Sequence, residues 1–318
     1  TVIIFAVILL LPIVTFNFKP NQISAIDNRK LTEFPAFNSN ASVKEFVKDL
    51  NSYFNDCLCF RALFNSSSVL IQDKLFGVLV HPLYTNGKEG YVFLKLRPQL
   101  TDFEYVNEFV DFVAKLQTYC RERDAIFLFS LEPAKQTVYE QYLPKGVNYK
   151  NDRVKLMLSG LTEKNINSVY TAPALIEASK QTQVYNIKYD AGHWNDHGAF
   201  VGISHMLETL QKDYASLSLP KKEDFDISYE LRTSLPVSYY PIKEKVPVYT
   251  LKSPQAVRVD TYKDEIKTNE TGWYYSHYKN PHKASAPKIL VFMGSYFLNK
   301  EKFLAESFSE TIFVHSYK

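Results

Sequence analysis

Residues 288–297 read KILVFMGSYF, an apolar run that ends in a glycine and a serine. A short continuous apolar run of this kind is typical of a strand buried in a parallel sheet. Ser295 would then follow the carboxyl end of the strand, at the edge where open α/β sheets bind ligands. A serine in such a turn is a common nucleophile, provided that a histidine accepts its proton and a carboxylate orients the histidine.

A second stretch, residues 189–199 with the sequence YDAGHWNDHGA, can supply both partners. It joins a predicted strand at 183–187 to a predicted helix, so it lies in a loop at the carboxyl edge of the sheet. His193 is in this loop, and Asp190 precedes it by three residues. The two stretches together predict a triad with Ser295 as nucleophile, His193 as base and Asp190 as the acid that orients it.

The same loop allows other interpretations. Asn195 or Asp196 is well placed to cap the following helix. His193 and His197 have the spacing of the two ligands in an H-E-x-x-H zinc motif, but Trp194 occupies the position of the glutamate, so the general base is missing. A lone serine after a strand is more often a turn or cap residue than a nucleophile. We expect neither a metal nor a cofactor.

Strands and helices alternate along the rest of the chain. A capping box of Ser42 and Glu45 predicts the start of one helix. Residues 221–285 are predicted to form an excursion of loops and small strands. The alternation predicts an α/β domain of three layers, with a mainly parallel sheet and helices on both faces. Further predicted helices are 104–120, 174–179, 198–210 and 300–309, and further predicted strands are 125–129, 166–170, 288–293 and 311–315.

The first eighteen residues contain no charge. They are slightly short for a spanning helix, which needs about 20 residues, and no small-residue cleavage site follows them. We predict a signal-anchor at 1–18, a linker at 19–40 and a domain at 41–318 held outside the cytoplasm, at the periplasmic or cell-surface side of the cell membrane. The alternative is a buried N-terminal helix or strand. Both ends of the sequence are expected to be clipped.

Composition excludes several classes of protein. The chain has 37 Lys and Arg against 34 Asp and Glu, a balance that argues against a nucleic-acid binder. Its hydrophobic fraction of 46% excludes wholesale disorder. The 10 glycines form neither a G-x-G-x-x-G nor a P-loop pattern, which removes the main support for nucleotide binding. Cys57, Cys59 and Cys120 are odd in number, so no complete disulfide framework is implied.

Six motifs in a fixed order carry a resemblance. They are IDNRKL and FP within residues 26–35, YFNDCLCFR at 53–61, GKEGYVF at 87–93, PAKQTVY and YLP within 133–144, HWNDHGA at 193–199 and the strand run ILVFMGSYF at 289–297. In this order they resemble the alginate O-acetyltransferase family (AlgX/AlgJ-like or DHHW proteins) of the SGNH-hydrolase superfamily. Two departures stand out: Asp190 and His193 are separated by two residues instead of one, and Met293-Gly294 replaces Gly-Asp.

The resemblance implies an extracytoplasmic polysaccharide O-acetyltransferase that works through an acetyl-serine at Ser295. It implies a polysaccharide acceptor and a membrane-bound O-acyltransferase as the acetyl supplier. The backbone of Gly294 and Ser295 is the candidate oxyanion site, and Trp194, Asn195 and Tyr296 are candidates for substrate binding. Two alternatives remain open: a carbohydrate acetylesterase that uses the same triad, and a non-catalytic cell-envelope protein that binds or assembles polysaccharide.

Overall fold

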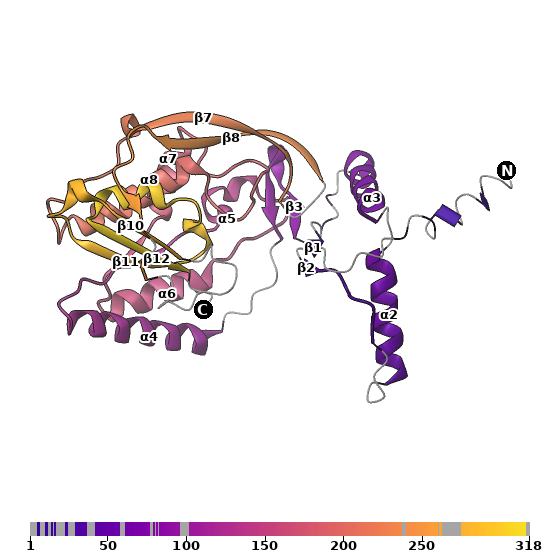
Figure 1. Cartoon of the computed structure of the whole chain (residues 1–318), viewed down its shortest axis with the longest axis horizontal. Coiled ribbons are helices and arrows are strands. Elements are labelled where there is room, and N and C mark those ends of the chain that lie inside the picture. Colours follow the sequence, from indigo (N-terminus) through magenta and orange to yellow (C-terminus); the bar gives the residue numbers. More distant parts are fainter. Residues whose placement is uncertain are drawn as a thin grey trace. The chain divides into compact units, whose positions relative to one another are not determined.

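A computed structural model describes residues 5–6, 10–11, 14, 16, 23–24, 29–36, 42–57, 61–76, 79, 81, 83–95, 102–236, 240–259, 261–262 and 275–315. The chain divides into two units (Figure 1). The first comprises residues 1–85 and 232–244, and the second comprises 86–231 and 245–318. All the candidate site residues lie in the second unit. The predicted linker at 19–40 and the predicted domain start at residue 41 stay predictions.

The first unit contains helices α2 (Val43–Cys57) and α3 (Arg61–Phe76), together with the short antiparallel pair β1 (Ile23–Ser24) and β2 (Arg29–Lys30). The predicted capping box is confirmed. The backbone N–H of Ser42 donates to Glu45 Oε2 at 3.1 Å, and the N–H of Glu45 donates to Ser42 Oγ at 3.2 Å. These two bonds satisfy N–H groups that the first turn of α2 leaves without an intrahelical partner.

Most of the predicted signal-anchor, residues 1–18, lies outside the described residues. Within the part of the chain that is described, no helix combines the length and the apolar character needed to cross a membrane. This finding contradicts the prediction of a single-pass anchor at the cell membrane that holds the domain outside the cytoplasm.

The second unit is an α/β domain whose main sheet has the strand order β11-β12-β10-β9. Strands β11 and β12 run parallel, with Met293 opposite His315, whereas β10 runs antiparallel to both β12 and β9. A separate parallel pair consists of β5 and β6. The strand predicted at 166–170 is found as β6, whereas the one predicted at 125–129 is shifted, because β5 begins only at Phe129. The sheets are therefore mixed and not mainly parallel. The first unit includes residues 84–85 of β3, 232–234 of β7 and 241–244 of β8. The strands are β3 (Tyr84–Asn86), β4 (Val92–Leu94), β5 (Phe129–Leu131), β6 (Ser168–Tyr170), β7 (Phe225–Ser234), β8 (Pro241–Leu251), β9 (Val257–Arg258), β10 (Tyr275–Lys279), β11 (Lys288–Met293) and β12 (Glu310–His315).

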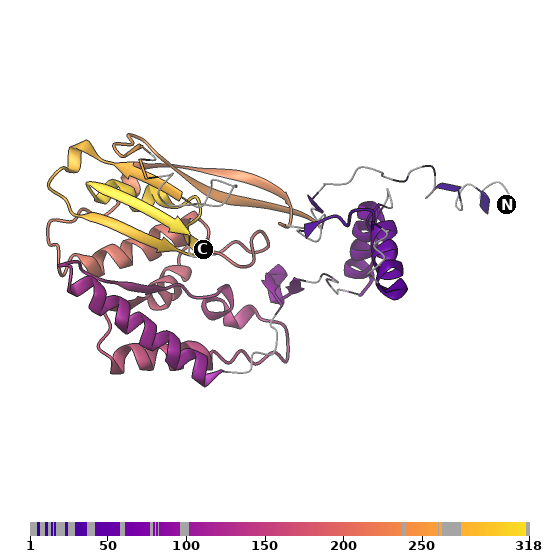
Figure 2. The same cartoon turned by 60° about the horizontal axis from the view of Figure 1, so that its bottom comes forward.

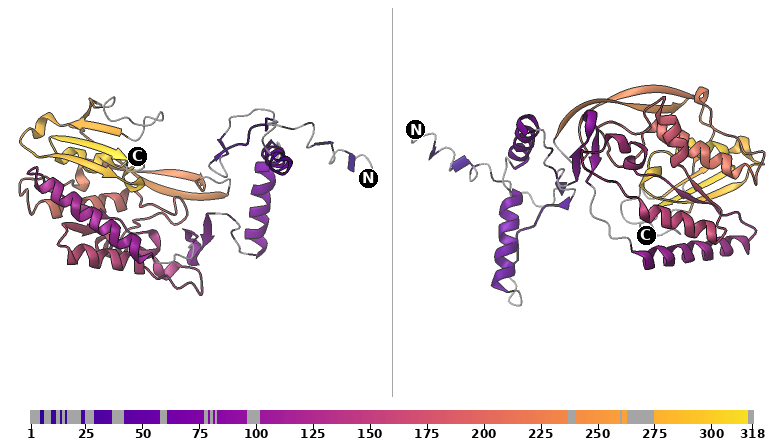
Figure 3. Two further views of the ribbon diagram at one scale, coloured as in Figure 1. Left: turned by 90° about the horizontal axis from the view of Figure 1, so that it is seen from below. Right: turned by 180° about the vertical axis from the view of Figure 1, so that it is seen from behind.

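Helices cover these sheets unequally. Helices α4 and α6 lie side by side and share a core of valines and leucine (Figures 1 and 3). Helix α8 packs on the face of β11 that carries Ile289 and Val291. On the opposite face of β11, Leu290 and Phe292 are exposed by 54% and 73%, so the predicted helical cover on both faces is not seen for this strand. The helices are α4 (Phe103–Arg121), α5 (Lys135–Val138), α6 (Asp152–Glu163), α7 (Ala172–Ser179) and α8 (Asp196–Leu210).

Two predicted elements are wrong. Residues 183–187 form bends instead of a strand, because their backbone groups bond to separate partners and not to one neighbouring ladder. The N–H of Val184, for example, donates to the hydroxyl of Tyr139 at 3.1 Å. Residues 300–309 form short 3-10 turns in place of a helix, since consecutive apolar residues from Phe303 onward are all buried and no single helical face could bury them.

Residues 221–285 were predicted to form loops and small strands, but much of this stretch is a long hairpin of β7 and β8. It is drawn in orange, and Figure 2 shows the two strands running beside each other. The prediction thus missed two strands of 10 and 11 residues. Only Phe225 and a few residues of β8, including Tyr249, are buried, so most of the hairpin lacks the continuous apolar signal by which a buried strand is recognised.

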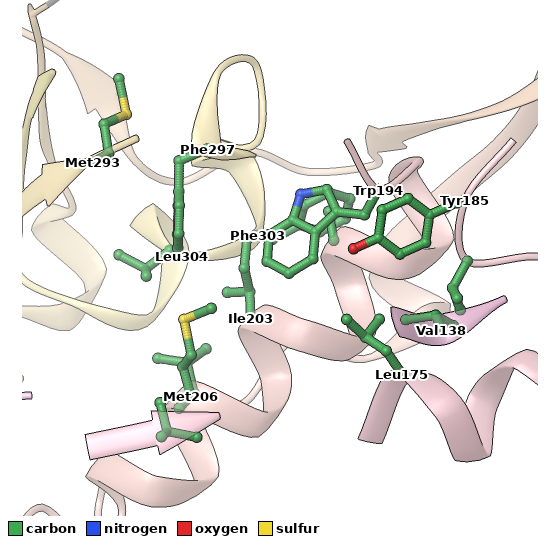
Figure 4. Close-up of a cluster of buried hydrophobic side chains, with 14 of the residues drawn as sticks. Val138, Leu175, Tyr185, Trp194, Ile203, Met206, Met293, Phe297, Phe303 and Leu304 are labelled. Atoms are coloured by element: carbon green, nitrogen blue, oxygen red, sulfur yellow. The ribbon is translucent and has the colours of Figure 1, made fainter. Parts of the chain in front are cut away.

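The core of the second unit lies directly beneath the candidate site. Figure 4 shows Trp194, Phe297 and Ile203 in one buried cluster. Gly202 of α8 leaves the space that the indole occupies, because a Cβ at this position would lie 2.4 Å from Trp194 Cζ3. The loop that follows residue 187 is thereby held against α8 by its own tryptophan.

A fully buried lysine joins two segments of this core. Lys135 Nζ donates to the carbonyl oxygens of Val92 at 2.7 Å and Ile187 at 2.8 Å, and the rings of Tyr91 and Phe93 lie 5.4 and 5.1 Å from it. The lysine therefore holds the irregular segment before the candidate site against β4. The P-x-K motif predicted neither this burial nor these partners.

Replacing Lys135 with methionine is expected to lower the free energy of unfolding by roughly 2–4 kcal/mol, because two carbonyl oxygens lose a charged donor. Chemical denaturation of the purified protein would measure the change. Lys212→Met is the matched control: Lys212 is exposed, and its substitution should change the stability by less than about 0.5 kcal/mol. Equal effects of the two substitutions would contradict the structural role given to Lys135.

Candidate active site

Ser295, His193 and Asp190 lie in one chain of hydrogen-bonding contacts. His193 Nε2 is 2.9 Å from Ser295 Oγ, across 102 residues of sequence. On the other side of the ring, His193 Nδ1 is 2.8 Å from Asp190 Oδ1 and 3.1 Å from Oδ2. The side chains of His193 and Asp190 are each 36% exposed, so solvent reaches them. The geometry is that of a nucleophile, a base and an orienting acid.

The loop conformation around Asp190 aims its carboxylate at the histidine. Asp190 has a φ of 48°, in the left-handed region that aspartate and asparagine tolerate better than most residues. Its Oδ1 also accepts the backbone N–H groups of Gly192 at 3.3 Å and His193 at 3.2 Å. One carboxylate oxygen thus organises the turn that carries the histidine.

Helix α8 begins immediately after this loop. Asn195 is the N-cap, since its side chain accepts the N–H of Gly198 at 3.0 Å, which confirms one of the two predicted caps. Gly198 is required here, because a Cβ would lie 2.2 Å from the carbonyl oxygen of Val184. The close approach fixes the start of α8 against the segment that leads into the loop.

Asp196 ties the loop to the chain beyond the serine. Its carboxylate pairs with Lys300, and with Lys302 at 2.6 Å, and it accepts the backbone N–H of Tyr249 at 2.9 Å. Burial alone would raise the pKa of Asp196, but the two lysines outweigh burial and lower it. Sequence reasoning considered Asp196 only as a cap. No local motif signals this cluster, because its members come from three separate segments.

Two of the three candidates for substrate binding are buried. Trp194 is 2% exposed, and its Nε1 donates to the carbonyl oxygen of Tyr296 at 2.8 Å. Asn195 is 5% exposed and is occupied as the cap of α8. These two side chains are therefore corrected to packing and capping roles, since a sugar ring cannot reach them. Tyr296 is partly buried, and its hydroxyl and carbonyl both face the histidine loop.

The candidate oxyanion groups lie where β11 ends. Ser295 opens the 3-10 turn Ser295–Phe297, with Gly294 as its N-cap in extended conformation. The first N–H groups of a helical turn have no partner within the turn, so the N–H of Ser295 is suited to an oxyanion beside Oγ. A Cβ added to Gly294 would meet no atom within 4 Å, so nothing in the packing requires glycine here.

Gly294→Ala is expected to leave the fold intact and to raise the free energy of unfolding by about 0.5 kcal/mol, because alanine restricts the unfolded chain more than glycine does. The φ of −89° at this position suits any residue. Thermal unfolding would measure the change. Gly198→Ala is the contrasting variant and should be strongly destabilised by its 2.2 Å clash. If Gly294→Ala were destabilised, the conclusion that a Cβ at Gly294 meets no neighbouring atom would be contradicted.

His197 would have been the second ligand in the zinc interpretation of His193 and His197, but its imidazole bonds elsewhere. Its Nδ1 is 2.9 Å from the hydroxyl of Tyr249. Its pKa is lowered, chiefly by burial and then by the charge of Lys222. Among the residues that the structure describes, no group of three or more His, Cys, Asp and Glu side chains could hold a metal ion.

Comparisons with known proteins point to one family. Residues 85–239 match the family model of the SGNH hydrolase-like domain of acetyltransferase AlgX, a range that includes Asp190 and His193 and ends before Ser295. No curated protein gives a significant match to the sequence.

Solved structures resemble the chain at low sequence identity. Bacillus cereus PatB1 with a sulfonyl adduct is 18% identical, with a TM-score of 0.53 over 73% of this chain and 84% of that chain. A second structure of PatB1 is 16% identical, with a TM-score of 0.54 over 72% and 86% of the two chains. The O-acetyltransferase domain of Pseudomonas putida AlgJ is 15% identical, with a TM-score of 0.47 over 71% and 75%. The likeness to PatB1 shows a shared fold. With the match over residues 85–239, it confirms the resemblance seen in the sequence: this part of the chain is similar to the SGNH hydrolase-like domain of acetyltransferase AlgX.

Proposed function

We propose that this protein transfers an acetyl group to a hydroxyl of a polysaccharide through an acetyl-serine at Ser295. The observation that carries the proposal is the unbroken contact chain in which His193 lies 2.9 Å from the serine oxygen and 2.8 Å from the Asp190 carboxylate. An activated serine can attack a carbonyl carbon, and residues 85–239 match the SGNH hydrolase-like domain of acetyltransferase AlgX.

The first half of the reaction forms the acetyl-enzyme. Ser295 Oγ attacks the acetyl carbonyl carbon while His193 Nε2 accepts the hydroxyl proton, and the Asp190 carboxylate accepts a hydrogen bond from Nδ1–H of the resulting imidazolium. The carbonyl oxygen becomes an oxyanion, which the backbone N–H of Ser295 is placed to stabilise. The bond between the acetyl carbon and the donor's leaving oxygen then breaks, and His193 returns the proton to that oxygen.

The second half transfers the acetyl group. A sugar hydroxyl gives its proton to His193 and attacks the acetyl-serine, and the Ser295 Oγ leaves with that proton. If water attacks in place of the sugar, the products are acetate and free enzyme. The partial exposure of His193 and Asp190 is compatible with either acceptor. On the resemblance to the family, we propose a polysaccharide acceptor and a membrane-bound O-acyltransferase as the source of the acetyl group.

One assay separates the possible outcomes. The purified chain is incubated with p-nitrophenyl acetate, with and without neutral and acidic oligosaccharides, and the sugars are analysed by mass spectrometry. Acetylated sugar supports transfer. Release of acetate at the same rate with and without sugar would overturn transfer in favour of an esterase. If the chain neither cleaves the ester nor becomes acetylated at Ser295, a catalytic role for the triad is excluded.

A further inference from the structure

The two halves of the candidate triad come from segments that share no β ladder. His193 follows the irregular bends at 183–187, whereas Ser295 follows β11. Parallel strand pairing therefore cannot set the distance between them. Something else must hold the histidine loop against the serine turn.

Tyr296, the residue after the serine, contacts the histidine loop in three ways. Its hydroxyl donates to the carbonyl oxygen of Gly192 at 2.8 Å, and its own carbonyl oxygen accepts Trp194 Nε1 at 2.8 Å. Its ring meets the imidazole of His193 edge to face, with centroids 5.1 Å apart and an interplanar angle of 74°. The residues directly before and after the histidine are thus both attached to Tyr296.

The single hydroxyl proton of Tyr296 has a choice of acceptors. The carbonyl oxygen of Gly192 lies 2.8 Å from the hydroxyl and that of Pro133 lies 3.0 Å from it, so the shorter contact is the one with Gly192. The proton of Tyr296 is therefore available to Gly192. Burial raises the pKa of Tyr296, so the hydroxyl remains a donor.

The contact with Gly192 acts on the peptide that leads into His193. The carbonyl oxygen of this peptide accepts from Tyr296, and its N–H, which belongs to His193, donates to Asp190 Oδ1 at 3.2 Å. Both polar groups of one peptide plane are therefore held, one from the serine side and one from the acid. The orientation of this peptide plane fixes the backbone of His193, from which the imidazole projects. It therefore also sets the direction in which Nε2 points towards Ser295.

We propose that Tyr296 is the positioning residue for His193, and that it sets the alignment of the imidazole with the serine through its attachments on both sides of the histidine, to the Gly192–His193 peptide and to Trp194. The inference rests on the proposed function, since it assumes that His193 accepts the serine proton. Tyr296 itself takes no part in proton transfer.

The test is Tyr296→Phe, which keeps the ring contacts and removes only the hydroxyl. We expect the rate constant for acetylation of Ser295 by p-nitrophenyl acetate to fall about 10- to 100-fold, since a displacement near 1 Å can cost that much. KM should change little. The burst amplitude counts the folded active sites, so the rate constant per site separates misalignment from loss of folded protein.

Tyr139→Phe is the matched control. Tyr139 is also buried, and its hydroxyl also bonds to backbone, at Val184, but it does not touch the loop of His193. The Tyr139→Phe variant should be less stable than the wild type, but its rate constant for acetylation of Ser295 per active site should be that of the wild type. If Tyr296→Phe acylates as fast as Tyr139→Phe, the positioning role is overturned.

Two further outcomes are decisive. If Tyr296→Phe gives no folded protein, Trp194→Phe removes the other attachment to Tyr296, and an unchanged rate constant per site would then overturn the proposal. Failure of the proposed function looks different: the wild type would show no burst, and Ser295→Ala would behave like the wild type.

Discussion

Ser295→Ala is expected to lower the rate of acetyl-ester cleavage by about 10³-fold or more, since removing the nucleophile of a serine-histidine pair has effects of that size. The hydroxyl is partly exposed and contacts only the imidazole among the side chains described, so its loss should change the melting temperature little. Initial rates with p-nitrophenyl acetate and a thermal melt would measure the two quantities on one preparation.

Ser309→Ala is the matched control for this substitution. Ser309 is also partly buried, and its hydroxyl donates to the carbonyl oxygen of Pro287 at 3.2 Å, away from the triad. It should retain the wild-type rate. A Ser295→Ala protein that keeps more than a tenth of the activity would assign the chemistry to another residue.

Asp190→Asn is expected to lower the same rate by about 10³- to 10⁴-fold through the tautomer of His193. Asparagine tolerates the left-handed backbone at this position, so the turn should persist. Its amide oxygen would take the place of Oδ1 and keep the backbone N–H groups of Gly192 and His193, and the NH₂ group would take the place of Oδ2, 3.1 Å from Nδ1, where it favours an Nδ1 without a proton. The imidazole would then carry its proton on Nε2 and could not accept one from Ser295.

Steady-state rates would measure this loss, and the ¹⁵N chemical shifts of His193 would report the tautomer. Asp124→Asn provides the control, because Asp124 is exposed and has a φ of 54°, so it makes the same change in the same backbone region. Equal activity of the two variants would show that Asp190 does not orient the histidine.

The candidate site could be predicted from the sequence more fully than the sheet that carries it. The run at 288–293 and the D-x-x-H loop are local signals, and both place their polar residues after apolar segments. The contact between Ser295 and His193 is observed, yet the predicted reason for it, two strands whose carboxyl ends meet at one edge of a parallel sheet, is wrong. Tyr296 and the start of α8 hold the loop in place of a strand at 183–187.

The remaining errors have a common physical cause. Trp194 was a candidate for substrate binding because a tryptophan beside a histidine carries no local sign of burial, and only the fold brings Gly202 beneath it. The mixed sheet arises because β10 enters between β9 and β12 from a segment predicted to be an excursion of loops and small strands. Pairing of strands distant in sequence cannot be inferred from periodicity, which reports only local burial.

The burial of Lys135 has a consequence for an enzyme that handles activated acetyl groups. Small acetyl donors also react directly with lysine amines, and the reaction removes the positive charge. Lys288 and Lys155, whose side chains are each 75% exposed, are open to such damage, whereas Lys135 is fully enclosed and holds two carbonyl oxygens. In the folded state, burial thus keeps acetyl donors away from Lys135, on which the core depends. In a mass-spectrometric footprint, acetylation of Lys135 would mark molecules that had opened.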